Sequence, residues 1–159
     1  MQNGQLLAAA KAAKQRGVVF DVGHGGGSFD YTICEPALQQ GATPDTISSD
    51  IHAVSINTPG YPTLPNVMSK FLNLGMTLED VVAKATAEPA KLIGRVPGLG
   101  TLRIGAPADV AVFDLLDGPV EFVDTRNNKR NGTKKLAPVL TVKGGRPFGR
   151  PPMPFPFTF

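Results

Sequence analysis

The first half of the chain alternates short apolar runs with helix-forming segments. Residues 5–15 are rich in Ala and Lys and predict a helix, which a C-capping glycine closes. Residues 18–22 form an apolar run typical of a short strand buried in a parallel sheet. Residues 28–40 predict a helix that begins at a serine and bends at Pro36, and residues 45–50 predict a second strand. This order predicts a right-handed βαβ unit with functional residues at the carboxyl ends of its strands.

The second half changes from helical to strand-like spacing. A loop over 57–65 precedes a helix predicted at 66–74, and a further helical stretch runs from a capping box at Thr77 past a proline to Gly94. Beyond Gly98 the chain predicts a small β-rich unit. Its strand-like pieces are residues 101–104, 108–114, 120–124 and 136–143.

Composition narrows the class of protein. The 159 residues are 42% hydrophobic and 18% charged, which is typical of a folded domain with a sizeable core. The formal charge is +3, and much of the excess lies in one Asn/Gly-rich segment. We interpret this segment as a solvated hairpin loop and expect no nucleic-acid partner, because no helix or aromatic platform accompanies the charges. The basic residues are Arg126, Lys129, Arg130, Lys134 and Lys135.

Cysteine usage and the chain ends indicate a compartment. The single Cys34 cannot form an internal disulfide, which fits a reducing environment, and we expect it to pack in the core. No apolar run reaches transmembrane length, and the start of the chain is not a signal peptide. The sequence therefore predicts a cytoplasmic protein without a membrane partner. The Pro/Phe-rich tail at 147–159 is interpreted as a strap packed on the domain, with a polyproline ligand for another protein as the alternative.

The stretch GVVFDVGHGGGSF ends a predicted strand at a histidine surrounded by glycines. His24 and Asp50 would stand at the ends of the two predicted strands, where imidazole and carboxylate groups are natural ligands for zinc or a similar metal. Glycines there would leave room for a metal and its substrate. The alternative is that His24 is a buried structural histidine and Asp50 a capping residue, and the spacing leaves both open.

Other glycine-rich motifs do not match. A dinucleotide-binding fingerprint would need glycine where Ser28 stands, and the Lys-Ser/Thr of a phosphate-binding loop is missing. The Gly-x-Ser-x-Gly turn of serine hydrolases occurs nowhere in the chain. The sequence therefore disfavours these three classes.

Four stretches resemble a known family. FDVGHGGGSF, PDTISSDIH, MSKFLNLGMTLEDVVAKATAEPAKLIG and LGTLRIGAPADVAVFDL resemble the C-terminal part of the amidohydrolase superfamily, in its dihydroorotase-like amidohydrolase/deacetylase branch. The resemblance implies an α/β fold, the C-terminal portion of a metal-dependent (β/α)8 TIM barrel with a small β-sandwich segment. It divides the chain into barrel residues 1–97, sandwich residues 98–146 and the tail.

The resemblance also implies roles for individual residues. His24 and Asp50 match ligands of one or two zinc ions (Zn²⁺), and Asp50 matches the catalytic aspartate that transfers a proton during hydrolysis of an amide or ester. The implied substrate is a small acylated or cyclic amide. His52 follows Asp50 by two positions, so in a continued strand its side chain would point the same way. It is a candidate substrate contact, with a supporting position behind the site as the alternative. Asn57 and Tyr61, in the next loop, are candidate substrate contacts, with plain turn residues as the alternative. Asp109 matches a structural position of the β unit.

The sequence departs from the family pattern in its histidines. His24 and His52 are the only two, and the family's His-x-His is absent. Since catalytic zinc usually needs three protein ligands, we expect the C-terminal half of a larger enzyme. We expect the isolated chain to be oligomeric or poorly folded and without hydrolase activity. The second hypothesis is a non-catalytic remnant that binds a partner chain, either a second copy or a complementing N-terminal half.

Overall fold

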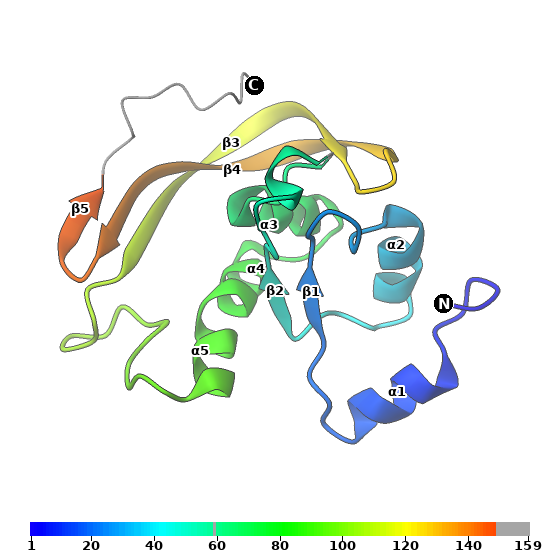
Figure 1. The fold of residues 1–159 in the computed structure, drawn as a ribbon, viewed down its shortest axis with the longest axis horizontal. Helices are drawn as coiled ribbons and strands as arrows, with labels where there is room; N and C mark the ends of the chain where they lie inside the picture. The colour runs from blue at the N-terminus through cyan, green and yellow to red at the C-terminus, as the bar shows by residue number, and fades with distance from the viewer. Residues whose placement is uncertain (59, 149–159) are drawn as a thin grey trace.

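The structure, a computed structural model, describes residues 1–58 and 60–148. Helices surround a short parallel sheet on one side of the molecule, and a long antiparallel hairpin arches over α3 (Figure 1). The parallel sheet contains two strands and the antiparallel sheet three. The strands are β1 (Asp21–Gly23), β2 (Thr46–Ser48), β3 (Val110–Val123), β4 (Lys129–Lys143) and β5 (Arg146–Phe148). The helices are α1 (Ala8–Gln15), α2 (Tyr31–Gln39), η1 (Ser55–Asn57), α3 (Leu64–Asn73), α4 (Leu78–Ala85) and α5 (Ala87–Ile93).

The predicted βαβ unit is confirmed, with shorter strands than expected. β1 and β2 pair in parallel through three residue pairs, with Val22 opposite Ile47. Val18 and Val19 precede the strand and are about half exposed, so the prediction of a strand from residue 18 was wrong. Pairing begins only beyond Phe20, whose amide donates to the Asp45 carboxylate at 2.9 Å.

The helices begin where side chains cap them. α2 starts at Tyr31 and not near residue 28, because the Asp30 carboxylate accepts the Thr32 amide at 2.8 Å. Thr77 caps α4 as predicted, since its hydroxyl accepts the Asp80 amide at 3.1 Å. Pro36 lies inside α2. Among the described residues, no helix combines the length and apolar composition needed to cross a membrane.

The β-rich unit is one long hairpin with a short third strand. Residues 101–104 do not form the expected strand. Leu102 and Ile104 are 82% and 102% exposed, because within the described part of the chain no strand pairs with this segment. β3, β4 and β5 form a single sheet in the described part of the chain, whereas a β-sandwich needs a second one. The tail from residue 149 onward lies outside the described residues.

The basic segment is not a solvated loop. The turn between β3 and β4 occupies residues 124–128, so four of the five predicted loop cations lie on β4. Arg130 forms an ion pair with Glu35 at 2.6 Å and lies 5.1 Å from the ring centroid of Tyr31. This residue therefore joins the hairpin to α2.

The core lies between α2, α3, the parallel sheet and the hairpin. Phe29 packs edge-on against Tyr31 and Phe71, with ring centroids 5.1 and 5.9 Å apart. Cys34 packs against this core, as predicted, and burial raises the pKa of its thiol to about 12. The buried hydrophobic residues are Phe29, Tyr31, Ile47, Val67, Met68, Phe71, Val81, Phe122 and Leu136.

Candidate active site

A cavity opens where the two parallel strands end. Its volume is about 590 Å³, and serine hydroxyls and two carboxylates contribute to its wall. This is the edge of an open α/β sheet at which ligands characteristically bind. The lining residues are Asp21, Val22, Gly23, Ser28, Ser48, Ser49 and Asp50.

Asp50 lies over the glycines that follow β1. Its backbone has a φ of +49°, an unusual conformation for a residue other than glycine, and the residue is exposed. A β-carbon placed on Gly25 would lie 2.5 Å from Asp50 Oδ2, and one placed on Gly23 would lie 3.0 Å from Asp50 Cβ. The amide of Gly25 also donates to the Ser49 carbonyl at 3.0 Å. The glycines are therefore needed because the side chain of Asp50 lies directly against their backbone, with its carboxylate at Gly25 and its Cβ at Gly23.

A second carboxylate in the wall is held by hydroxyl groups. Thr46 and Ser48 each donate to Asp21 at 2.6 Å, one to each carboxylate oxygen. These bonds join β1 to β2 beside their backbone pairing and fix the Asp21 side chain. Asp50 is thus the cavity carboxylate whose oxygens carry no such hydroxyl contact among the described residues.

His24 is buried and turned toward α3. Its Nδ1 lies 3.0 Å from the Gly25 carbonyl and its Nε2 lies 2.6 Å from Lys70 Nζ. Its ring stacks on Phe29 with 5.0 Å between the centroids. With Nδ1–H donating to the carbonyl and Nε2 accepting from the lysine, both ring nitrogens are engaged. A metal-ligating role for His24 stays a prediction, and it would require Lys70 to withdraw.

Burial controls the charge of this pair. Burial first, and then the positive charge of Lys70, lower the pKa of His24 from 6.5 to about 4. Burial also lowers the pKa of Lys70 from 10.5 to about 7, against the opposing effect of Asp124. At neutral pH the imidazole is therefore uncharged, and its Nε2 accepts a hydrogen bond from Lys70 Nζ.

The stability of the fold should rise between pH 7 and pH 9. Over this range the unfolded chain keeps the Lys70 proton while the folded chain loses it, so the free energy of unfolding increases with pH. We expect the melting temperature to rise by several degrees, at roughly 2–4 °C per kcal/mol. Thermal unfolding followed by circular dichroism at pH 7, 8 and 9 measures this change in melting temperature.

The matched variant Lys70→Met should lose this rise. The comparison stops at pH 9 because Cys34, whose pKa is raised from 9.0 to about 12, acts in the opposite direction beyond it. A flat or falling melting temperature in the unsubstituted chain would contradict the assigned burial of the Lys70 charge.

The three predicted substrate contacts do not line the cavity. β2 ends at Ser48, so the strand does not continue to His52, and the reasoning that His52 and Asp50 share a strand face was wrong. His52 is exposed, and its amide donates to the Ser55 hydroxyl at 2.8 Å. Asn57 ends η1, and Tyr61 has a φ of +47° and is 56% exposed. Their role in substrate binding stays a prediction.

The donor set does not fit a complete zinc site. Across residues 1–58 and 60–148, no three His, Cys, Asp or Glu side chains gather closely enough to hold a metal ion. Asp50 offers an exposed carboxylate, while the ring nitrogens of His24 are engaged elsewhere. We therefore derive no chemical step through a metal from these residues.

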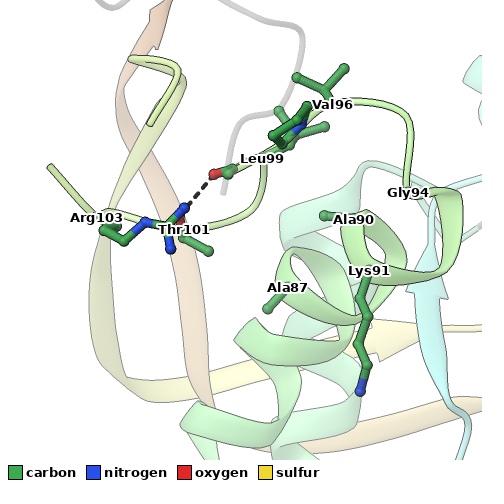
Figure 2. A pocket seen from close by; sticks show the side chains of 10 residues that line it. Ala87, Ala90, Lys91, Gly94, Val96, Leu99, Thr101 and Arg103 are labelled. Atoms are coloured by element: carbon green, nitrogen blue, oxygen red, sulfur yellow. Dashed lines mark hydrogen bonds between the residues drawn. The ribbon is translucent and has the colours of Figure 1, made fainter. Parts of the chain in front are cut away.

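A second cavity is lined by residues that lie later in the chain than those of the strand-end cavity. It has a volume of about 360 Å³ and lies between α5 and the segment that follows it (Figure 2). Ala87, Ala90 and Leu99 line it, and the Lys91 side chain extends away from Val96. The hydrogen bond drawn there joins the Thr101 hydroxyl to the Gly98 carbonyl at 2.8 Å. No carboxylate or imidazole lines this cavity, so the strand-end cavity is the candidate active site.

Comparison with known proteins identifies the family to which this chain belongs. A model of the amidohydrolase family matches residues 28–147, and the chain belongs to this family. It is 33% identical to a deacetylase of Brucella anthropi over 144 residues, covering 91% of this chain and 35% of that protein. A deacetylase of Agrobacterium fabrum is 35% identical over 144 residues, with the same coverage. The chain thus spans about a third of the length of these relatives.

Solved structures agree with this assignment. The structure superposes on an adenine deaminase with a TM-score of 0.86 and 29% identity, covering 92% of this chain and 39% of that one. It superposes on a dihydroorotase with a TM-score of 0.78 and 33% identity, covering 89% and 37%. The chain therefore has the α/β architecture of part of these enzymes.

Sequence reasoning missed Lys70 and Asp21. Lys70 stands in the run Val-Met-Ser-Lys-Phe, whose apolar residues share one face of a helix, and this pattern does not distinguish an enclosed lysine from a solvated one. Asp21 follows the apolar run before His24, and the alternating hydroxyls of Thr46 and Ser48 face it. Period-two spacing in the second strand could have indicated that contact.

Proposed function

We propose that this chain forms part of a metal-dependent amidohydrolase of the deacetylase type, which hydrolyses a C–N bond of a small acylated or cyclic amide. The observation that carries the proposal is the position of Asp50, an exposed carboxylate at the strand-end cavity of a chain related to deacetylases. The cavity, at about 590 Å³, has the size of a small-molecule site. An ester is a chemically similar second substrate.

The proposed chemistry uses Asp50 as the acid–base group. Its carboxylate takes a proton from the water that attacks the amide carbonyl, and a tetrahedral intermediate forms. The same group then gives the proton to the leaving nitrogen as the C–N bond breaks. The close approach of Asp50 to Gly23 and Gly25 holds the carboxylate at the cavity. Asp21 is held in place by two hydroxyl groups and contributes a second, fixed carboxylate to the cavity wall.

We include zinc in the proposal because the chain belongs to the amidohydrolase family, and not because its described side chains form a metal site. Bound zinc would polarise the carbonyl and make water more acidic. Asp50 is the cavity side chain that we propose as a ligand. His24 would join it only if Lys70 withdrew, and further ligands would have to come from outside the described residues.

The alternative function is that of a partner-binding chain without its own catalysis. The parallel sheet has two strands in the described residues, and several apolar side chains are exposed. Val54, Leu102 and Ile104 are 76%, 82% and 102% exposed. A second copy or a complementing N-terminal half could cover such surfaces, because large exposed apolar patches mark interaction sites.

A chimeric enzyme tests the proposal. The 144 matched residues of the Brucella anthropi deacetylase are replaced by the matching residues of this chain. We expect the chimera to hydrolyse N-acetylated amino acids in the presence of zinc, and Asp50→Asn to lower kcat by roughly 10²–10⁴-fold. The matched control Asp117→Asn, at an exposed position on β3, should leave kcat unchanged.

Two outcomes would count against catalysis by this site. Full activity of the chimera with Asp50→Asn would remove Asp50 from the mechanism. A folded, monodisperse chimera without turnover on amides or esters would favour the partner-binding alternative.

A further inference from the structure

Lys70 holds three separate segments of the chain together. The residue lies on α3 and is 1% exposed. Its Nζ lies 2.6 Å from His24 Nε2, 2.9 Å from the Gly60 carbonyl and 2.6 Å from the Val123 carbonyl. An ammonium group has three N–H donors, so each has an acceptor here. The acceptors come from the loop after β1, the loop before α3 and the end of β3.

Among residues 1–58 and 60–148, no carboxylate binds this buried ammonium directly. Asp124 interacts with it electrostatically, but the Asp124 oxygens accept hydrogen bonds from the amides of Tyr31, Arg126 and Asn128. Phe29 supplies an aromatic face, with its centroid 5.1 Å from Nζ. The Lys70 ammonium is thus surrounded by an imidazole nitrogen, two carbonyl oxygens and an aromatic ring. The same set of groups could surround a bound cation, and here the ammonium takes that place.

The contacts continue from Lys70 to the candidate catalytic carboxylate. The His24 ring held by Lys70 donates through Nδ1 to the Gly25 carbonyl at 3.0 Å. The Gly25 amide donates to Ser49, and the Gly25 backbone lies against the Asp50 carboxylate. A displacement of His24 would therefore move the surface on which Asp50 lies. Gly60 cannot take a side chain without contact, since a β-carbon there would lie 2.8 Å from His24 Cε1.

We infer that Lys70 is a positioning residue whose ammonium, and not a metal ion, is the partner of His24 Nε2, and that it fixes the His24–Gly25 backbone against Asp50. The pairing of Lys70 with His24 stands on the contacts alone. The importance of the Asp50 position rests on the proposed function.

Nuclear magnetic resonance of the isotopically labelled chain tests the inference without an activity assay. The chain has two histidines, so long-range ¹H–¹⁵N spectra at pH 6.5 resolve buried His24 beside exposed His52. Zinc ions are added to the unsubstituted chain, and the His24 nitrogen resonances should stay in place while His52 serves as the internal comparison. Lys70→Met should move the His24 Nε2 resonance toward that of a nitrogen without a donor. It should also move the Gly25 amide and Asp50 carboxyl resonances.

Lys11→Met is the matched control, because Lys11 is exposed on α1, and it should leave all these resonances unchanged. A zinc-dependent shift of His24 Nε2 in the unsubstituted chain would overturn the pairing, and this measurement holds even if Lys70→Met does not fold. A His24 shift in Lys70→Met with Gly25 and Asp50 unmoved would overturn the positioning role. Neither result depends on turnover, so failure of the proposed function is seen separately in the chimeric enzyme.

Discussion

Asp124→Ala is expected to lower the free energy of unfolding by roughly 3–5 kcal/mol, because it leaves several amide groups without their acceptor at a cost of about 1–3 kcal/mol each. Asp124 is fully buried at the hairpin turn. Its carboxylate accepts the Tyr31 amide at 2.9 Å and the amides of Arg126 and Asn128 at 2.8 Å each. Alanine would leave these three N–H groups without their acceptor.

The charge state of Asp124 supports the size of this effect. Burial raises the pKa of Asp124, but the hydrogen bonds from Tyr31 and Asn128 outweigh it, and the net pKa lies below the ordinary value. Its contribution is therefore present above the ordinary carboxyl pKa and is lost as the pH falls.

Urea denaturation at pH 7 measures the loss, with Asp117→Ala on the same hairpin as the exposed control. The control should change the stability by less than about 0.5 kcal/mol. If Asp124→Ala stayed within about 1 kcal/mol of the unsubstituted chain, the turn network would not contribute as described.

Phe29→Ala is the second large effect, a loss of about 3–5 kcal/mol. The ring is 1% exposed and contacts Tyr31 and Phe71 edge-on. It also stacks on His24 and lies beneath Lys70. Alanine would open a cavity beside the buried Lys70 ammonium and remove the ring on which the His24 imidazole stacks. The variant would therefore lose core packing and also loosen the contact between His24 and Lys70.

Thermal or urea unfolding tests this expectation with two comparisons. Phe29→Leu keeps most of the volume and should recover much of the loss, although it cannot restore the stacking on His24. Phe148→Ala, at a residue 58% exposed, should change stability little. Equal effects at Phe29 and Phe148 would mean that Phe29 does not anchor this core.

Much of the local structure followed from sequence patterns. The apolar runs and the glycine and threonine caps predicted the βαβ unit, the helical segments at 66–74 and 77–94, and the change to strands beyond Gly98, because each signal acts within a few residues. The boundaries were less accurate where one contact decides them. The Asp30 carboxylate caps α2 and so decides where this helix begins. The Phe20 amide binds the Asp45 carboxylate just before β1 begins to pair. The sequence pattern predicted neither contact.

The candidate site was predicted only in part. Asp50 was placed at a strand end, and the structure puts it in the cavity wall. The positive φ of Asp50 and its contact with Gly25 depend on how the two strand ends approach each other, which no local pattern encodes. The same holds for the position of the hairpin turn, which Asp124 fixes through contacts that reach Tyr31, 93 positions away.

The sequence by itself determined the family, the βαβ unit and the presence of an acid at a strand end, because these depend on residue order and short-range periodicity. The tertiary structure alone decided that Lys70 is buried and that His24 faces it. A lysine on a helix is ordinarily solvated, and it remains inside here because three segments distant in sequence each bring one acceptor to its ammonium.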